Sequence, residues 1–278
     1  MPTVAFQGEA GAYSEQAAFD FFGGQAQPQP RPTFDAVFAE TASGTCDYGI
    51  VPVENSLAGS VHRNYDLLMR HSLHIVGEVI VRVRHNLIAL PGVELREIQR
   101  VYSHWQALDQ CEKTLGRLLP GVERVQVYDT AGAVKMVLEE QRRDTAAIAS
   151  KRAAELYNLP ILREGIEDDP TNFTRFVVLG REPASPPPAV PCKTSIVFAT
   201  RNTPGALYKA LAAFALRDID LSKIESRPLQ GSPWEYLFYL DFIGNQTDEV
   251  CAHALAQLRE FSTFVRVLGS YPRANMPA

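Results

Sequence analysis

The sequence predicts an α/β fold over residues 1–182 and a second, smaller unit of βαββαβ order over residues 192–278. In the first region short apolar runs alternate with amphipathic segments, which is typical of strands that feed directly into helices. Residues 183–191 separate the two regions and contain Pro183, Pro186, Pro187, Pro188 and Pro191. Because a proline-rich run favours extended backbone and acts as a semi-rigid spacer, we expect a domain boundary there.

Five strand–helix pairs are expected in the first region. They lie at 4–8 and 14–22, 48–53 and 57–70, 100–104 and 105–119, 125–129 and 130–140, and 145–150 and 151–159. Strands rich in Val and Ile are also expected at 74–83, 84–90 and 172–180, and the first two are candidates to cross between two lobes. Repeated strand–helix pairs favour a mostly parallel sheet.

A small polar residue stands at each expected helix start: Ser14, Asn55 or Ser56, Ser103, Thr130 and Ser150. Such residues cap helices, and Ser103 with Gln106 fits a capping box. If the five helix starts meet at one crevice, their free N–H groups and positive dipole ends favour an anionic ligand. Simple capping is the alternative for each residue taken alone.

The second region has a different rhythm. Strands are expected at 194–200, 219–230, 234–244 and 263–272, helices at 206–218 and 247–261, and a turn at 231–233. Leu207, Leu211, Phe214 and Ala215 form one apolar stripe on the first of these helices. This βαββαβ order predicts an antiparallel sheet with two helices on one face.

Composition excludes several classes of protein. The formal net charge is −5, with 27 Lys and Arg against 32 Asp and Glu, so nucleic acid is a poor partner. Cys46, Cys111, Cys192 and Cys251 stand apart, without CxxC or His spacing, so we expect no metal site and no disulfide framework. No apolar stretch has membrane length and no signal-peptide pattern opens the chain, so we expect a cytoplasmic protein without a membrane partner.

Several segments in a fixed order resemble the monofunctional prephenate dehydratases and the closely similar arogenate dehydratases. They are GEAGAYSEQAA (8–18), VPVENSLAGSVHRNYDLL (51–68), VYSHWQALDQC (101–111), DTAGAV (129–134), AAIASKRAAELYNL (146–159) and NFTRFVVLG (172–180). The second region resembles an ACT regulatory domain through NTPGALY (202–208) and ESRP (225–228). Each motif alone means little, but their joint order is specific.

The resemblance implies a catalytic domain at 1–182 that is built of two lobes, similar to periplasmic solute-binding proteins, with the active site in the cleft between them. A linker at 183–191 and an ACT domain at 192–278 would follow. The implied reaction is the decarboxylating dehydration of prephenate to phenylpyruvate in phenylalanine biosynthesis, with arogenate dehydration or dual activity as the alternative. It implies no metal and no other cofactor.

The family's catalytic positions correspond to Thr174, Asn55, Ser103 and Gln110. Thr174 is the implied hydroxyl donor to the leaving group. Because seven helical residues complete nearly two turns, we expect Gln110 above Ser103 on one face. Substrate-binding candidates are Ala12, Ser14, Glu54, Ser56, Thr130 and Arg175, with Arg63 as a further carboxylate partner.

Three of these positions carry open alternatives. Strand alternation turns Arg175 away from Thr174, which favours a structural ion pair equally well. Trp105 stands where the family commonly has Pro, and its ring could narrow the cleft. Ala12 stands where prephenate-specific members usually have Thr, so we hypothesise activity on both substrates.

The effector expected from the resemblance is L-phenylalanine, bound between subunits. The corresponding residues are Asn202, Pro204, Gly205, Ala206, Leu207, Glu225, Ser226, Arg227 and Pro228. The alternative for 225–228 is a β-bulge and turn before Pro228. A homodimer is the minimum expectation and a homotetramer is the alternative, since exposed sheet edges pair readily.

Two other classes of protein are alternatives for a sequence of this composition. A non-catalytic amino-acid-sensing protein would share the fold but needs none of the four catalytic positions. A nucleotide-binding oxidoreductase would need GxGxxG after the first strand, whereas GEAGAYS has only two glycines.

Overall fold

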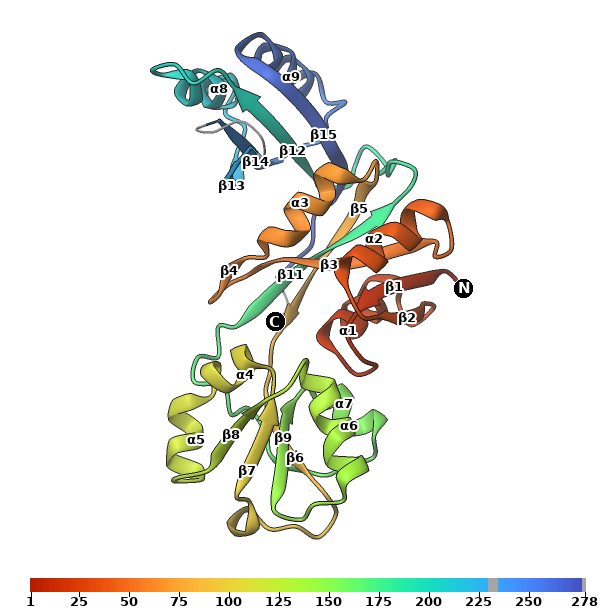
Figure 1. The fold of residues 1–278 in the computed structure, drawn as a ribbon. Coiled ribbons are helices and arrows are strands. Elements are labelled where there is room, and N and C mark those ends of the chain that lie inside the picture. The colour runs from red at the N-terminus through yellow and green to blue at the C-terminus, as the bar shows by residue number, and fades with distance from the viewer. Residues whose placement is uncertain (230–234, 277–278) are drawn as a thin grey trace. The chain divides into compact units, whose positions relative to one another are not determined.

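The computed structural model describes residues 1–229 and 235–276, so the turn expected at 231–233 lies outside the described residues. Packing divides the chain into two compact units. Unit 1 comprises Met1–His71, Val79–Val177 and the terminal Met276, and unit 2 comprises Ser72–Glu78 and Val178–Asn275. Two strands, β5 (His74–Arg82) and β11 (Phe173–Gly180), therefore begin in one unit and end in the other. Figure 1 colours the elements along the chain.

The first sheet of unit 1 has the strand order β2-β1-β3-β11-β5, with β4 paired to β3. Its other elements are β1 (Thr3–Gln7), α1 (Tyr13–Phe22), β2 (Gln27–Arg31), α2 (Phe34–Ser43), β3 (Tyr48–Asn55), β4 (Gly59–Ser60) and α3 (His62–Arg70). β1 is parallel to both β2 and β3, as the strand–helix pattern predicts. Sequence analysis missed β2 and α2. β2 reads QPQPR, and proline is tolerated in a strand at a sheet edge, which is where β2 lies.

The second sheet of unit 1 has the order β10-β6-β9-β7-β8. Its strands are β6 (Asn86–Ala89), β7 (Arg100–Ser103), β8 (Glu123–Gln126), β9 (Thr145–Ala149) and β10 (Ile161–Arg163). The helices are the 3₁₀ turn η1 (Leu95–Glu97), α4 (Trp105–Gln110), α5 (Glu112–Leu118), α6 (Thr130–Glu140) and α7 (Lys151–Leu156). β7 is parallel to β8 and β9, whereas β6 is antiparallel to β9 and β10, so the sheet is mixed.

The helix expected at 105–119 is two helices. Cys111 has φ −114° and ψ 6° and separates α4 from α5. The carboxylate of Asp168 accepts hydrogen bonds from the backbone N–H groups of Lys113 and Thr114, each at 2.8 Å. A side chain far along the sequence thus satisfies backbone N–H groups in the first turn of α5. A new helix can therefore begin at a place where the apolar periodicity predicted that one helix would continue.

The helix caps differ from those expected. Ser150 is the N-cap of α7 and its hydroxyl accepts from Ala153 N, as predicted. His104 caps α4 and Asp129 caps α6, in place of the expected Ser103 and Thr130. Ala12 precedes α1 without a side-chain cap bond, and Asn55 ends β3 instead of starting a helix.

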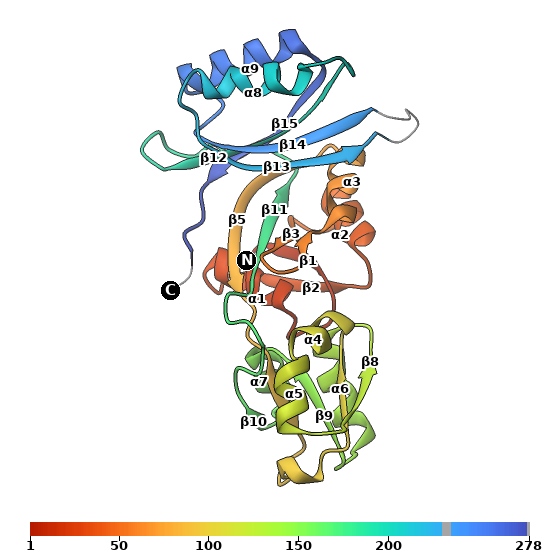
Figure 2. The same cartoon turned by 90° about the vertical axis from the view of Figure 1, so that its left-hand side faces the viewer.

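Unit 2 has the predicted βαββαβ order. Its elements are β12 (Cys192–Thr200), α8 (Ala206–Ala215), β13 (Leu221–Pro228), β14 (Tyr236–Ile243), α9 (Glu249–Phe261) and β15 (Ser262–Pro272). The sheet order is β13-β14-β12-β15 and these pairs are antiparallel. Figure 2 shows α8 and α9 on one face, where Phe198, Phe214, Phe242 and Leu258 form the centre of the core.

The opposite face of this sheet carries buried polar side chains and the segment Ser72–Glu78. Lys193 Nζ lies 2.8 Å from Glu78 Oε1, and the Glu78 side chain is fully buried. A Cβ atom at Gly269 would overlap the carbonyl oxygen of Ile75, so glycine is required for this close backbone approach. The first half of β5 is therefore an integral part of unit 2.

In the part of the chain that the structure describes, every helix falls short of the length and apolarity that a membrane crossing needs.

Candidate active site

Unit 1 contains a cleft of about 710 Å³, a volume within the usual range for small-molecule sites. Side chains from both sheets of unit 1 line it. The lining includes six of the ten catalytic and substrate-binding candidates, namely Ala12, Ser14, Asn55, Gln110, Thr130 and Thr174, together with Arg63 and Trp105. Residues separated widely in the sequence thus meet in one cavity.

Four helices of unit 1 begin at this cleft. Tyr13 begins α1, Phe34 begins α2, Trp105 begins α4 and Thr130 begins α6, and all four line the cavity. Of the five expected helix starts, those of α1, α4 and α6 meet here, whereas Ser150 at the start of α7 does not line the cleft and Asn55 ends a strand. Positive helix ends and backbone N–H groups at a cavity favour a negatively charged ligand.

The side chain of Asn55 has a fixed orientation. Its Oδ1 accepts hydrogen bonds from the backbone N–H groups of Leu57 at 3.1 Å and Ala58 at 2.9 Å. Its Nδ2 lies 2.9 Å from Thr174 Oγ1 and 2.7 Å from Asn172 Oδ1. Because backbone N–H groups can only donate, the amide cannot be flipped without losing both loop contacts.

The Thr174 hydroxyl accepts from Asn55, and this is its one side-chain hydrogen bond among the described residues. Its own proton is therefore available to a ligand. Thr174 and Phe176 both line the cleft because alternate residues of β11 share a face. Arg175 lies between them in the strand and is not among the residues that line the cleft.

Gln110 joins this group through two residues that sequence analysis missed. Its Oε1 accepts from Asn172 Nδ2 at 2.9 Å and lies 3.0 Å from His85 Nε2. Asn172 is fully buried and His85 is 2% exposed. Asn172 could have been suspected from its place in NFTRF, two residues before Thr174. His85 follows the long strand β5 and carries no local signal.

Burial lowers the pKa of both histidines that line the cleft, His85 and His104. For His85 this outweighs the opposite effect of the hydrogen bond to Gln110 Oε1, and for His104 burial is again the main cause. Burial also raises the pKa of the Asp129 carboxyl. Among the described residues, no three His, Cys, Asp or Glu side chains group as a metal site would require.

Three further candidates lie outside the cleft lining, which corrects their expected placement. Ser103 is fully buried and its Oγ donates to Ile148 O at 2.7 Å. Because α4 starts only at Trp105, the helical repeat that would place Ser103 below Gln110 does not exist. Ser56 Oγ donates to Thr171 O and so holds the segment before β11 in place. Glu54 precedes Asn55 in β3, so its side chain points to the opposite face of the sheet.

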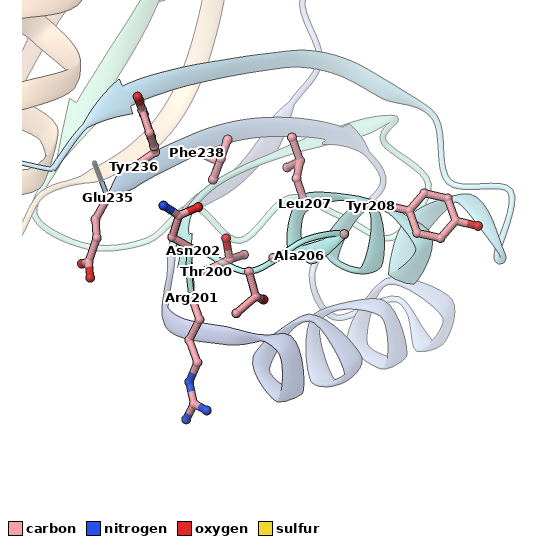
Figure 3. A pocket seen from close by; sticks show the side chains of 11 residues that line it. Thr200, Arg201, Asn202, Ala206, Leu207, Tyr208, Glu235, Tyr236 and Phe238 are labelled. Atoms are coloured by element: carbon pink, nitrogen blue, oxygen red, sulfur yellow. The ribbon is translucent and has the colours of Figure 1, made fainter. Parts of the chain in front are cut away.

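Unit 2 has a smaller pocket of about 210 Å³ at the start of α8. Figure 3 shows Thr200, Asn202 and Ala206 together there, while Arg201 extends away. Of the effector candidates, Asn202, Gly205, Ala206 and Leu207 line this pocket. Gly205 has φ 77° and is the N-cap of α8, a backbone conformation that favours glycine.

The remaining effector candidates do not line this pocket. They are Pro204, Glu225, Ser226, Arg227 and Pro228. The last four continue β13 as a regular strand, with Arg227 opposite Leu237 and Pro228 opposite Tyr236. The bulge that was the alternative for 225–228 is therefore absent there, and the irregularity of β13 lies between Leu221 and Lys223.

Known proteins are similar to this chain in both sequence and fold. Residues 4–184 match the family model described as prephenate dehydratase. The chain belongs to the prephenate dehydratase family. A curated relative is arogenate dehydratase/prephenate dehydratase 2, chloroplastic, of Arabidopsis thaliana. It is 51% identical over 278 residues, which cover 97% of this chain and 72% of the relative.

Two solved structures have a fold similar to that of this chain. A prephenate dehydratase from Arthrobacter aurescens in complex with L-Phe is 35% identical, with a TM-score of 0.90 and coverage of 98% of this chain and 90% of its own. The second, described as GqqA, a novel type of quorum quenching acylase, is 39% identical, with a TM-score of 0.89 and coverage of 97% of each chain.

Proposed function

We propose that this member of the family converts prephenate to phenylpyruvate in phenylalanine biosynthesis, with arogenate, which yields phenylalanine, as an alternative substrate. The reaction breaks the bond between C1 and its carboxylate, which leaves as carbon dioxide. The electron pair moves through the ring as C4 loses its hydroxyl, which leaves as water after taking a proton. Aromatisation drives the reaction, so the protein's task is to bind two carboxylates and to stabilise the departing oxygen.

The observation that carries this proposal is the hydrogen bond from Asn55 to Thr174 Oγ1. It fills the acceptor side of the hydroxyl and leaves its proton for a ligand in the cleft. A neutral threonine is a weak acid, so we assign Thr174 to donate a strong hydrogen bond to the leaving oxygen. Loss of one such oriented donor typically lowers kcat by about 10²- to 10³-fold.

The carboxylates are assigned to uncharged donors at the helix starts. Within the described residues the backbone N–H groups of Tyr13 and Ser14 have no acceptor, and Ser14 also contributes its hydroxyl to the cleft. Thr130 lines the cleft at the start of α6. Arg63 also reaches the cleft, but it is shared with Asp35, which accepts from its Nε at 3.1 Å.

The test uses the full-length protein with prephenate or arogenate and follows phenylpyruvate and phenylalanine separately by ultraviolet detection. The wild type should form at least one of them. Thr174→Val keeps the side-chain shape but removes the hydroxyl, so it should lose nearly all turnover, whereas Thr174→Ser should retain part of it. Full activity in Thr174→Val would refute the assignment.

We further propose that residues 192–278 act as an ACT domain that binds L-phenylalanine and lowers activity, following the linker 183–191 and the two-lobed catalytic domain 1–182. The L-Phe complex of the Arthrobacter relative supports this reading. The pocket in unit 2 offers the first turn of α8 for the carboxylate and Leu207 and Phe238 for the ring. Residues Glu225–Pro228 would then act from a second copy in a homodimer or homotetramer.

An amide hydrolase is the second candidate, favoured by the likeness to the acylase GqqA. Its substrate would be an acylated amine, and the product would be a free carboxylate and an amine. Incubating the wild type and Thr174→Val with an N-acyl amide separates the two functions. Amide cleavage without any turnover of prephenate or arogenate would replace the dehydratase proposal, and turnover of neither class would favour a sensor.

A further inference from the structure

One chain of hydrogen bonds fixes the orientation of three side-chain amides, those of Asn55, Asn172 and Gln110. It starts at the backbone N–H groups of Leu57 and Ala58, which can only donate, so Asn55 must turn its oxygen toward them. The Asn55 Nδ2 group then faces Asn172, whose Oδ1 accepts at 2.7 Å. Two fixed backbone donors thus set the direction of the next side chain.

The orientation of the Asn172 amide in turn sets the orientation of the Gln110 amide. Because the oxygen of Asn172 faces Asn55, its Nδ2 faces Gln110, and the atom that accepts there at 2.9 Å is Gln110 Oε1. The Gln110 NH₂ group is therefore turned away from Asn172. Gln110 lines the cleft, and its NH₂ group has no acceptor in the described part of the chain, so it is left for a ligand.

His85 is the last member of the chain. Its Nε2 lies 3.0 Å from Gln110 Oε1, and since that oxygen can only accept, Nε2 must carry the ring proton. Its Nδ1 lies 3.4 Å from the Tyr13 hydroxyl, which donates its own proton to Arg84 O at 2.6 Å. The Tyr13 oxygen could accept from Nδ1, but burial lowers the pKa of His85 and favours a neutral ring, and a neutral ring with its proton on Nε2 carries none on Nδ1.

We propose that Asn172 and His85 are positioning residues, which hold Gln110 with its carbonyl oxygen inward and its NH₂ group toward the substrate. The inference rests on the proposed dehydratase function and deepens it. Asn172 connects the two substrate donors, Gln110 and Thr174. Its Nδ2 group orients Gln110, and its Oδ1 accepts from Asn55, the amide that orients Thr174. The two donors are thus preset before substrate arrives, which is the condition for strong electrostatic catalysis.

The kinetic test removes the donor while keeping the bulk. His85→Leu loses the Nε2–H group, and kcat/KM should fall about 10- to 100-fold, the effect of one lost hydrogen bond to a charged ligand. His85→Gln keeps an N–H donor at nearly the same distance and should recover most of that loss. The exposed His253→Gln serves as the matched control, and thermal unfolding reports whether each variant is folded.

A double-mutant cycle shows whether His85 acts through Gln110. In a Gln110→Met background, adding His85→Leu should change kcat/KM by less than about twofold, because the side chain that it orients is already gone. Additive losses would overturn the inference, as they would mean that His85 acts independently of Gln110.

The final measurement does not depend on activity. The ¹⁵N chemical shifts of the wild-type His85 ring, assigned by their loss in His85→Gln, should show a protonated Nε2 and an unprotonated Nδ1. A proton on Nδ1 would refute the inference, even in a protein with full dehydratase activity. If Nε2 carries the proton but neither prephenate nor arogenate is converted, the orientation stands and the proposed function fails.

Discussion

The amide of Asn55 donates a 2.9 Å hydrogen bond to the hydroxyl of Thr174, although the two residues lie 119 positions apart. Asn55 ends β3 and Thr174 lies in β11, and these strands are neighbours in the first sheet of unit 1. Sheet pairing therefore brings together the two side chains that define the direction of the Thr174 proton. The first prediction tests this relationship.

Asn55→Asp keeps the size and the oxygen that caps Leu57 and Ala58, but it replaces the donor by an acceptor. Thr174 would then donate to the carboxylate and lose its free proton. We expect kcat to fall about 100-fold, and the unfolding temperature to fall as well because the carboxylate would face the oxygens of Asn172 and Phe173, as measured by steady-state kinetics and thermal unfolding. Asn245→Asp is a matched control, because Asn245 uses its Oδ1 as the acceptor from Thr247 N. Unchanged kcat in Asn55→Asp would contradict the assigned direction.

Ala12 lines the cleft and is only 8% exposed, so a larger side chain there must enter the substrate's space. Ala12→Thr should shift the ratio of kcat/KM toward prephenate by about tenfold over arogenate, which carries an amine in place of the ketone. The measurement is kcat/KM for both substrates on the variant and the wild type. Ala10→Thr is the control, since Ala10 does not line the cleft. An unaltered ratio would remove Ala12 as a determinant of preference.

The Lys193–Glu78 pair is buried, with side-chain exposures of 10% and 0%. Removing one partner leaves a buried charge, so Lys193→Met should lower the free energy of unfolding of unit 2 by about 3–5 kcal/mol. Lys193→Met with Glu78→Leu should recover much of it, because both charges are then absent. Denaturant unfolding followed by a probe in unit 2 measures this, with Glu155→Gln in an exposed pair as the control. Equal effects at the two sites would contradict the prediction.

Ala206 begins α8 and lines the pocket of unit 2. Ala206→Asp places a carboxylate at a helix start, which suits the helix dipole but repels the carboxylate of phenylalanine. The phenylalanine concentration for half-inhibition should rise at least about tenfold, relative to the variant's own turnover without effector. If inhibition is the same as in the wild type, the effector binds elsewhere, and competition at the cleft becomes the preferred reading.

Local patterns predicted much of the fold. Strand–helix alternation and the βαββαβ order of unit 2 are visible because side-chain periodicity and turn residues act over a few positions. The prediction was wrong where a distant group intervened. Asp168 starts α5 after a break at Cys111, and β2 forms at a sheet edge despite its two prolines.

The site shows the same division. The motifs identified Thr174, Asn55 and Gln110, but they also suggested Ser103 and Arg175, which lie outside the cleft. Asn172 and His85 were not identified at all. Their contacts join positions as far apart as 117 residues, and no periodicity records such a hydrogen bond.

By itself the sequence determined the order of elements, the two regions and the residue types at the cleft, since each depends on neighbours along the chain. Only the tertiary structure decided which of those side chains share one cavity and which way their amides point. The reason is physical: an amide has a donor face and an acceptor face, and the partners that choose between them arrive from other strands and helices.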